Sequence, residues 1–312
     1  MRIRKWFCLC LAFALLLSAC RAAAPSDTVD ADGRVRVLAS FAPIYALTLA
    51  VSNGSTGITV DCMAANSTGC LHDYQLTTSD MKRVDAADVF IIGGAGMEAS
   101  FLDKLCEQYP ALRVFDSSAN VHTLTEACDH AHDHDHDHEH AQDAVNAHLW
   151  LSCENAAQIA QNIAGKLSEL DAENAALYSE NAVQLCASLS ALKAQYAPLF
   201  ESAQHKQIIT FHEAFAYLAA EFDLEVTAVI ESEPGSAPDP QTLSELIDLA
   251  ASGEVAAIFT EPQYPDATAR VIAQETGVPV YALDPIVTGE MTADSFLSAL
   301  QSDLQILLDA VQ

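Results

Sequence analysis

The sequence predicts an α/β protein of two lobes, each built on a parallel sheet, joined by a long rigid linker helix. Eight short runs of apolar, β-branched and aromatic residues alternate with helical patterns, as in parallel sheets that helices cover on both faces. After the fourth run, a long Ala- and Leu-rich stretch interrupts the alternation and divides the runs into two groups of four. A chain of 312 residues, 51% of them hydrophobic, is long enough to build two such lobes.

Each predicted strand is a short apolar run between polar or turn-forming residues, a pattern typical of buried strands. The runs of the N-terminal lobe are Val35–Leu38, Ile58–Val60, Val89–Ile92 and Arg113–Phe115. Those of the C-terminal lobe are Gln207–Phe211, Val226–Ile230, Ala256–Phe259 and Val278–Leu283.

Helical patterns lie between the strands and after them. They cover Ser100–Gln108, Phe215–Phe222, Thr242–Ala251, Thr268–Glu275 and Ala293–Val311. The stretch Cys153–Phe200 is helical throughout except near Asp171–Asn174, and its Ala and Leu content strongly favours helix. We therefore expect an N-terminal lobe over residues 34–171, a linker helix over 172–200 and a C-terminal lobe over 201–312.

The N-terminus predicts export. A basic start (Arg2, Arg4, Lys5) precedes a short apolar run, Phe7–Leu17, that is too short to span a bilayer as a mature helix and is typical of a secretory signal. The sequence LSAC that closes it resembles a bacterial lipobox, which predicts a lipoprotein signal peptide over residues 1–19 and a lipid anchor on Cys20. An ordinary cleaved signal with an incidental cysteine is the alternative. Residues 20–33 have the composition of a flexible tether.

The charge of the chain limits its partners. The net charge is −29, and removal of residues 1–19 takes away three basic residues and no acid, which gives −32. Such a surface argues against nucleic acid and anionic headgroups as partners and favours cations. Six cysteines remain after cleavage and lipidation of Cys20, which permits up to three disulfides in an exported protein. Sequence does not select the pairing, although the short spacing of Cys62 and Cys70 makes that pair attractive.

A histidine-rich run indicates metal binding. Residues 129–140 read DHAHDHDHDHEH and have no apolar face at either the helical or the strand period. The run offers imidazoles and carboxylates, which are ligands for zinc and other late divalent metals. An expression tag or a solvated polar loop is the alternative, but tags lie at termini. Its predicted auxiliary ligands are His130, His132, His134, His136, His138 and His140.

Four isolated residues predict a second and more selective site. His212 follows the strand Gln207–Phe211 and Asp284 follows Val278–Leu283, and ligands of open α/β sheets bind outside these carboxyl ends. His72 follows the strand Ile58–Val60, and His148 lies just before a predicted helix. We expect these residues to converge between the lobes, where three imidazoles and one carboxylate suit tetrahedral zinc.

The motifs around these residues resemble those of the metal-specific solute-binding proteins of bacterial ABC importers, in the zinc-binding branch of the cluster A-I family. The resemblance runs from about Val35 to the C-terminus and includes the position of the acidic His loop. The motifs are His72–Asp80 (HDYQLTTSD), Gly93–Glu98 (GGAGME), Ala147–Leu151 (AHLWL), Thr210–Phe215 (TFHEAF), Thr260–Tyr264 (TEPQY) and Leu283–Pro285 (LDP).

This resemblance implies that His72, His148 and His212 are the imidazole ligands of a transported Zn²⁺. Asp284 matches a carboxylate that binds metal in several members, whereas others use water or a glutamate before the first histidine, a position that Leu71 occupies here. Thr78 also replaces a frequent proline. Manganese-binding relatives place a carboxylate at the position of His212, and an imidazole there favours zinc.

The remaining histidines and three glutamates are expected to have supporting or surface roles. His122 is a candidate for assisting the His-rich loop, and His205 is expected at the surface. Glu213 is a candidate for holding the imidazole tautomer of its neighbour His212, and Glu231 and Glu233 are candidates for lining the cleft.

The resemblance implies a zinc-capturing, non-enzymatic component of an ABC importer. We expect it to be monomeric, lipid-anchored at the outer face of the cytoplasmic membrane, and to deliver Zn²⁺ to a membrane permease. Binding of manganese or another divalent metal, or a metal-buffering surface adhesin, are the alternatives. A secreted zinc hydrolase is disfavoured because Ala216 stands where the second histidine of HExxH would be, and no G-x-S-x-G motif occurs.

Overall fold

The computed structural model describes residues 33–64, 71, 74–125, 145–231 and 237–312. Several predicted features lie outside the described residues: the signal peptide, Cys20, the tether up to residue 32, His72, Cys70, Cys128, Glu233 and the histidines of the run 129–140. No helix within the described ranges has both the length and the apolar character that crossing a bilayer requires.

The predicted α/β fold with two parallel sheets is confirmed. The first sheet consists of β1 (Val35–Ala39), β2 (Ile58–Cys62), β3 (Val89–Ile92) and β4 (Val114–Asp116), in the order β2-β1-β3-β4. All of its strand pairs are parallel. Each residue of the inner strand β3 is buried, which explains why its sequence is apolar without alternation.

The second sheet repeats this arrangement. It consists of β5 (Gln207–Thr210), β6 (Glu225–Val229), β7 (Val255–Thr260) and β8 (Val280–Ala282), in the order β6-β5-β7-β8, again with parallel pairs. Both lobes therefore follow the same strand order, so their first strands lie inside the sheet. In the second sheet β5 and β7 are the two central strands. The polar residues that follow them therefore lie at the middle of the carboxyl edge of the sheet.

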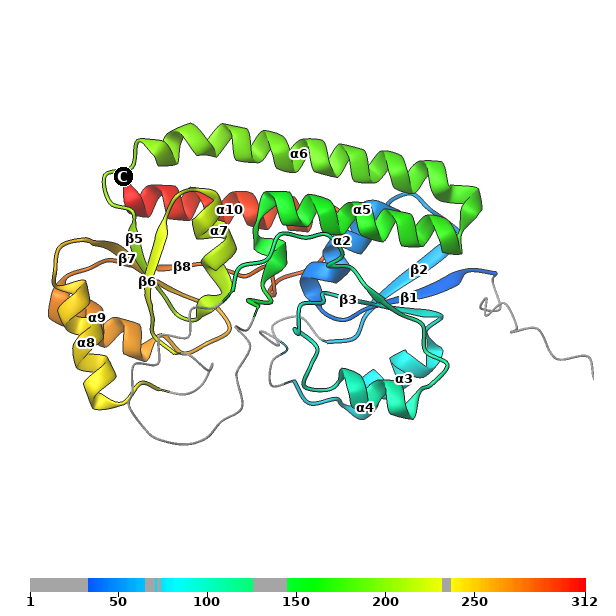
Figure 1. Cartoon of the computed structure of the whole chain (residues 1–312), viewed down its shortest axis with the longest axis horizontal. Helices are drawn as coiled ribbons and strands as arrows, with labels where there is room; N and C mark the ends of the chain where they lie inside the picture. The colour runs from blue at the N-terminus through cyan, green and yellow to red at the C-terminus, as the bar shows by residue number, and fades with distance from the viewer. Residues whose placement is uncertain (1–32, 65–70, 72–73, 126–144, 232–236) are drawn as a thin grey trace, which may run out of the picture.

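Helices cover both faces of each sheet (Figure 1). In the N-terminal lobe, α3 (Thr78–Ala86) and α4 (Leu102–Gln108) lie on the face opposite α2 (Ala42–Ser52) and α5 (Cys153–Leu170). In the C-terminal lobe, α8 (Pro240–Ala250) and α9 (Ala267–Thr276) lie opposite α10 (Ser295–Val311). The short helix α7 (Ala216–Glu221) follows β5. We call the residues up to the end of α5 the N-terminal lobe. The residues after the long helix α6 (Ala175–Glu201) form the C-terminal lobe.

A single helix, α6 (Ala175–Glu201), runs along both lobes above α5 and α10 (Figure 1). It follows a short 3-10 turn, Ala172–Asn174, at the predicted break. Its buried residues recur every three or four positions: Tyr178, Ala182, Leu185, Leu189, Leu192, Tyr196 and Phe200. This stripe packs against α5 and α2 of one lobe and α10 of the other, so α6 belongs to the core of both.

Two helices, α2 and α3, lie where the sequence analysis identified no helical pattern. Helix α2 is buried along most of its length and therefore lacks the polar face that marks an amphipathic helix. Helix α3 begins with a capping box: Thr77 Oγ1 accepts from the Asp80 amide at 3.3 Å and Asp80 Oδ2 from the Thr77 amide at 2.7 Å. Thr78, which replaces the family's frequent proline, is the first residue of this helix.

Four cysteines, Cys62, Cys106, Cys153 and Cys186, are free thiols. The thiol of Cys62 lies 3.1 Å from the carbonyl oxygen of Ala64. The pairing of Cys62 with Cys70 that the sequence made attractive stays a prediction, because Cys70 lies outside the described residues.

Candidate metal centre

Two of the predicted histidines meet at the boundary between the lobes. His148 caps the 3-10 turn Leu149–Leu151 ahead of α5, and His212 follows β5 at the carboxyl edge of the second sheet. Both side chains are fully buried, and their Nε2 atoms lie 3.2 Å apart. Two nitrogens bound to one tetrahedral zinc at 2.0–2.1 Å would lie about 3.3–3.4 Å apart. The spacing therefore suits two ligands of one metal ion.

The second ring nitrogen of His212 is held by a buried carboxylate. Nδ1 of His212 hydrogen-bonds to Oε1 of Glu261, and both side chains are fully buried. The other oxygen of Glu261 accepts from Nε2 of Gln263 at 2.6 Å. Burial raises the pKa of Glu261, and the hydrogen bonds from His212 and Gln263 oppose that rise. With the proton on Nδ1, Nε2 of His212 presents its lone pair to a metal.

The side-chain amide of Asn146 holds Nδ1 of His148, as Glu261 holds Nδ1 of His212. Oδ1 of Asn146 lies 3.1 Å from Nδ1 of His148 and also accepts from the His148 backbone amide at 3.0 Å. Nδ2 of Asn146 donates to the carbonyl oxygen of Glu213 at 3.0 Å, which fixes which end of the amide faces the ring. Nδ1 of His148 is therefore the donor, and its Nε2 carries the lone pair that a metal would bind.

Aromatic rings enclose the pair. Trp150 lies 5.3 Å from the His148 ring, and Phe41 packs edge-on against Trp150 at 4.9 Å. On the other side, Tyr264 stacks on Phe211 and presents its ring to His212 at 6.1 Å. These apolar walls keep water away from the nitrogens and strengthen electrostatic interactions at the site.

The structure does not bring Asp284 into this pair. Its carboxylate accepts hydrogen bonds from the amide of Val287 at 2.9 Å and from the hydroxyl of Thr288. Its own amide donates to the buried carboxylate of Asp303 at 3.2 Å. Across the described residues, no three His, Cys, Asp or Glu side chains form a group that could hold a metal. The geometry thus supplies two converging ligands, and His72 lies outside the described residues.

The prediction for the Glu213 side chain was wrong. Glu261, rather than Glu213, contacts the ring of His212, and Glu213 contributes only its backbone carbonyl, to Asn146. His205 is exposed, as expected. His122 is also exposed and lines a hollow with Glu154, Lys193 and Glu221, whose charged groups pair with one another. Glu231 is buried.

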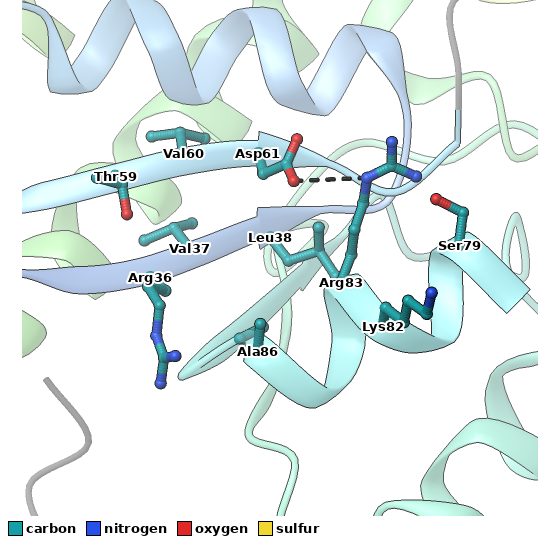
Figure 2. Close-up of a pocket in the computed structure, with 11 residues that line it drawn as sticks. Arg36, Val37, Leu38, Thr59, Val60, Asp61, Ser79, Lys82, Arg83 and Ala86 are labelled. Atoms are coloured by element: carbon teal, nitrogen blue, oxygen red, sulfur yellow. Dashed lines mark ion pairs between the residues drawn. The ribbon is translucent and has the colours of Figure 1, made fainter. Parts of the chain in front are cut away.

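A larger hollow, of about 360 Å³, lies elsewhere on the N-terminal lobe, between β1, β2 and α3. Figure 2 shows Arg36, Lys82 and Arg83 around it. Two of these cations already pair with carboxylates, Arg36 with Asp88 at 2.9 Å and Arg83 with Asp61 at 3.5 Å. No histidine lines this hollow, so it is separate from the metal centre.

Comparison with known proteins agrees with the geometry. The model of the family described as zinc-uptake complex component A, periplasmic, matches residues 37–310. The zinc-binding lipoprotein AdcA of Streptococcus pneumoniae is 26% identical over 304 residues, which cover 94% of this chain and 58% of AdcA. The chain thus spans less than two thirds of AdcA.

Two further relatives match over most of their length. The high-affinity zinc uptake system protein ZnuA of Bacillus subtilis is 28% identical over 288 residues, which cover 91% of this chain and 89% of that protein. Among solved structures, the SBP FpvC of Pseudomonas aeruginosa in complex with Mn²⁺ superimposes with a TM-score of 0.77 and 28% identity. That superposition covers 89% of this chain and 99% of FpvC.

Proposed function

Because this chain belongs to the family of component A of zinc-uptake complexes, we propose that it is the extracytoplasmic zinc-binding component of an ABC importer. It captures Zn²⁺ and delivers the ion to a membrane permease. The single observation that carries this proposal is the buried pair of His148 and His212, whose Nε2 atoms lie 3.2 Å apart. Imidazole nitrogens suit zinc better than manganese, which prefers oxygen ligands.

His72 and Asp284 are the proposed third and fourth ligands. The backbone carbonyl of Leu71, just before His72, accepts from the Tyr74 amide and from Ser100 Oγ at 3.0 Å each, which anchors the chain beside His72. Asp284 reaches the ion only when its carboxylate exchanges the hydrogen bond with Thr288 for the metal. In this proposal His72 completes the set of imidazoles, and Asp284 joins during binding.

The cellular setting is part of the proposal. Residues 1–19 are the signal peptide, Cys20 carries the lipid, and residues 20–33 tether the protein to the outer face of the cytoplasmic membrane. The N-terminal lobe (34–171), the linker helix (172–200) and the C-terminal lobe (201–312) act as one monomer that docks on the permease. The histidines of residues 129–140 collect zinc at weaker sites, since ordering a polar loop costs entropy that a preformed buried site avoids.

Zinc calorimetry on the chain without its first 20 residues tests the proposal. Alanine at His72, His148 or His212 should weaken zinc binding more than about 100-fold, beyond the loss expected for removing a supporting group. Deletion of residues 129–140 and alanine at the exposed His205 should leave the tightest site intact. Tight binding that survives His148→Ala and His212→Ala but vanishes with the deletion would refute the buried site.

Metal choice separates the alternatives. A titration with Mn²⁺ that is tighter than with Zn²⁺ would favour the manganese-binding reading, which the Mn²⁺ complex of FpvC makes a specific alternative. Metal-dependent hydrolysis by the zinc-loaded protein would instead favour an enzyme. Cells that contain the permease but lack this protein should lose zinc uptake at low external zinc. Unchanged uptake would favour a buffer or adhesin.

A further inference from the structure

Two side chains that flank His148 reach across the boundary between the lobes. Two residues before it, Asn146 donates through Nδ2 to the carbonyl of Glu213 at 3.0 Å. Two residues after it, Trp150 donates through Nε1 to the carbonyl of Pro285 at 2.8 Å. Both donors are buried, with exposed fractions of 2% and 1%. Each accepting residue directly follows a proposed metal ligand of the other lobe, His212 or Asp284.

Asn146 differs from Trp150 because both ends of its amide are used. Oδ1 holds the ring of His148 at 3.1 Å within the N-terminal lobe, and Nδ2 holds the C-terminal lobe. The amide is planar and rigid, so it turns as one unit. A displacement of Glu213 that stretches the Nδ2 hydrogen bond past about 3.5 Å ends that bond. The amide is then held only through Oδ1, by the ring and the backbone amide of His148, and can turn away from the ring while the backbone hydrogen bond remains.

The backbone of Asn146 is held by the same lobe. The hydroxyl of Tyr217, on α7, donates to the carbonyl oxygen of Asn146 at 2.7 Å. That hydroxyl also accepts from the amide of Leu124 at 2.9 Å, and the Asn146 amide donates to the carbonyl of Leu124 at 3.0 Å. Residue 146 is therefore fixed by two groups of the C-terminal lobe, Glu213 and Tyr217, in addition to its own neighbours.

We propose that Asn146 is a positioning residue that makes the orientation of His148 depend on the relative placement of the two lobes. When the lobes are together, Asn146 holds Nε2 of His148 toward His212. When they move apart, His148 loses its fixed orientation, and the ion loses a preorganised ligand. Asn146 thereby contributes to release as well as to capture. This inference rests on the proposed function, because it assigns a role at the same metal site.

The test uses two variants and a matched control in the chain without its first 20 residues. Asn146→Asp keeps an acceptor for His148 but removes the donor to Glu213, and Asn146→Ala removes both. Asn155→Asp is the control, because Asn155 is equally buried, at 3%, yet its Nδ2 donates at 3.0 Å to His122 within the same lobe. Zinc dissociation into excess chelator should be about 10- to 100-fold faster in Asn146→Ala and unchanged in the control. In Asn146→Asp the acceleration should be smaller, because the new carboxylate behind His148 raises the basicity of that ligand while the bond to Glu213 is lost.

Two metal-free measurements separate positioning from a general loss of stability. Trp150 is the one tryptophan left once residues 1–20 are absent, and its indole bond to Pro285 crosses the same boundary. Acrylamide should quench Trp150 more in both Asn146 variants than in Asn155→Asp. The ¹⁵N resonances of His148 should show a fixed Nδ1–H tautomer in the wild type and in Asn146→Asp, and mixed tautomers in Asn146→Ala.

Unchanged quenching together with an unchanged dissociation rate in Asn146→Asp would overturn the coupling of the lobes to His148. A fixed Nδ1–H tautomer in Asn146→Ala would overturn the role of Asn146 in orienting the ring. Failure of the wild type to bind zinc would instead refute the proposed function. The quenching and the ¹⁵N spectra are measured without metal and would still decide the role of Asn146.

Discussion

The ring of His212 and the carboxylate of Glu261 form a fully buried pair, 49 residues apart in sequence. The pair determines what His212 is able to do, because a proton held on Nδ1 leaves Nε2 as an acceptor for metal. A carboxylate behind a ligating imidazole also raises the basicity of the ligand. Glu261 lies one residue beyond β7, so the second sheet positions both members from adjacent strands.

Replacement of Glu261 by glutamine should weaken zinc binding about 10- to 100-fold, because Gln keeps the shape but removes the negative charge behind His212. Calorimetry at pH 7.5 measures the change. Glu213→Gln is the matched control: Glu213 directly follows His212, but its carboxylate does not contact the ring, so affinity should stay within about twofold. Equal losses in the two variants would mean that general negative charge, and not the contact with Nδ1, supports the site.

Zinc affinity should fall at acid pH, because protons compete with the metal for the ligating imidazole nitrogens. With two or three histidine ligands, the logarithm of the affinity should drop by two to three for each pH unit once all of these imidazoles are protonated in the metal-free protein. Titrations between pH 5 and pH 8 test this slope. A slope near one would indicate that a single imidazole binds the ion.

Glu98 should make the stability of the metal-free protein depend on pH. It is 1% exposed, and its carboxylate accepts from the backbone amides of Gly93 at 2.7 Å and Gly94 at 3.2 Å. Burial raises the pKa of Glu98 from 4.5 to about 7, although these hydrogen bonds oppose the rise. Between these two values the folded protein holds a proton that the unfolded chain has released. The stability contributed by Glu98 therefore decreases as pH rises through this window.

Urea unfolding of the wild type and Glu98→Gln in the presence of chelator measures this effect. The free energy of unfolding of the wild type, minus that of the variant, should fall by about 3 kcal/mol between pH 4.5 and pH 7.5. Any constant cost of losing one acceptor for the glycine amides cancels from this comparison. A difference that does not change with pH would contradict the raised pKa.

The thiol of Cys62 should react slowly in the folded protein. Burial raises its pKa to about 12, the charge of Asp61 adds to the rise, and Arg83 opposes it. At pH 8 alkylation should be roughly a thousandfold slower than in urea, because the thiolate is the reactive form. Asp61→Asn should speed the reaction, and mass spectrometry of the alkylated peptide reports the rate. Labelling at the same rate with and without urea would contradict this expectation.

Most of the fold could be predicted because its strands are short, apolar and regularly separated. Burial explains why helix α2 was not predicted. Helix α2 is enclosed by α5, α6 and the first sheet and shows no polar face, so its periodicity is lost. The strand predicted to start at Val278 begins at Val280 instead, after Pro279, whose nitrogen has no hydrogen to donate to a sheet.

The candidate site was only partly predictable for a different reason. His148 and His212 could be selected because they stand at the ends of recognisable elements. The partners of their Nδ1 atoms depend on contacts between segments distant in sequence, and Glu213 was chosen over Glu261 because it is adjacent to His212. One signal did exist: Glu261 closely follows the predicted strand Ala256–Phe259, the position that singled out His212 and Asp284.

Helix α6 links the two lobes over a long distance. Its 27 residues make a rod about 40 Å long that is packed into both lobes. A tilt of about 5° at one end of such a rod displaces the other end by about 3.5 Å, which exceeds the whole length of a zinc–nitrogen bond. Because α6 is packed into both lobes, a small change in its angle shifts one lobe relative to the other by a distance comparable to a coordination bond. If the protein acts as proposed, a permease would need to bend it very little to empty the site.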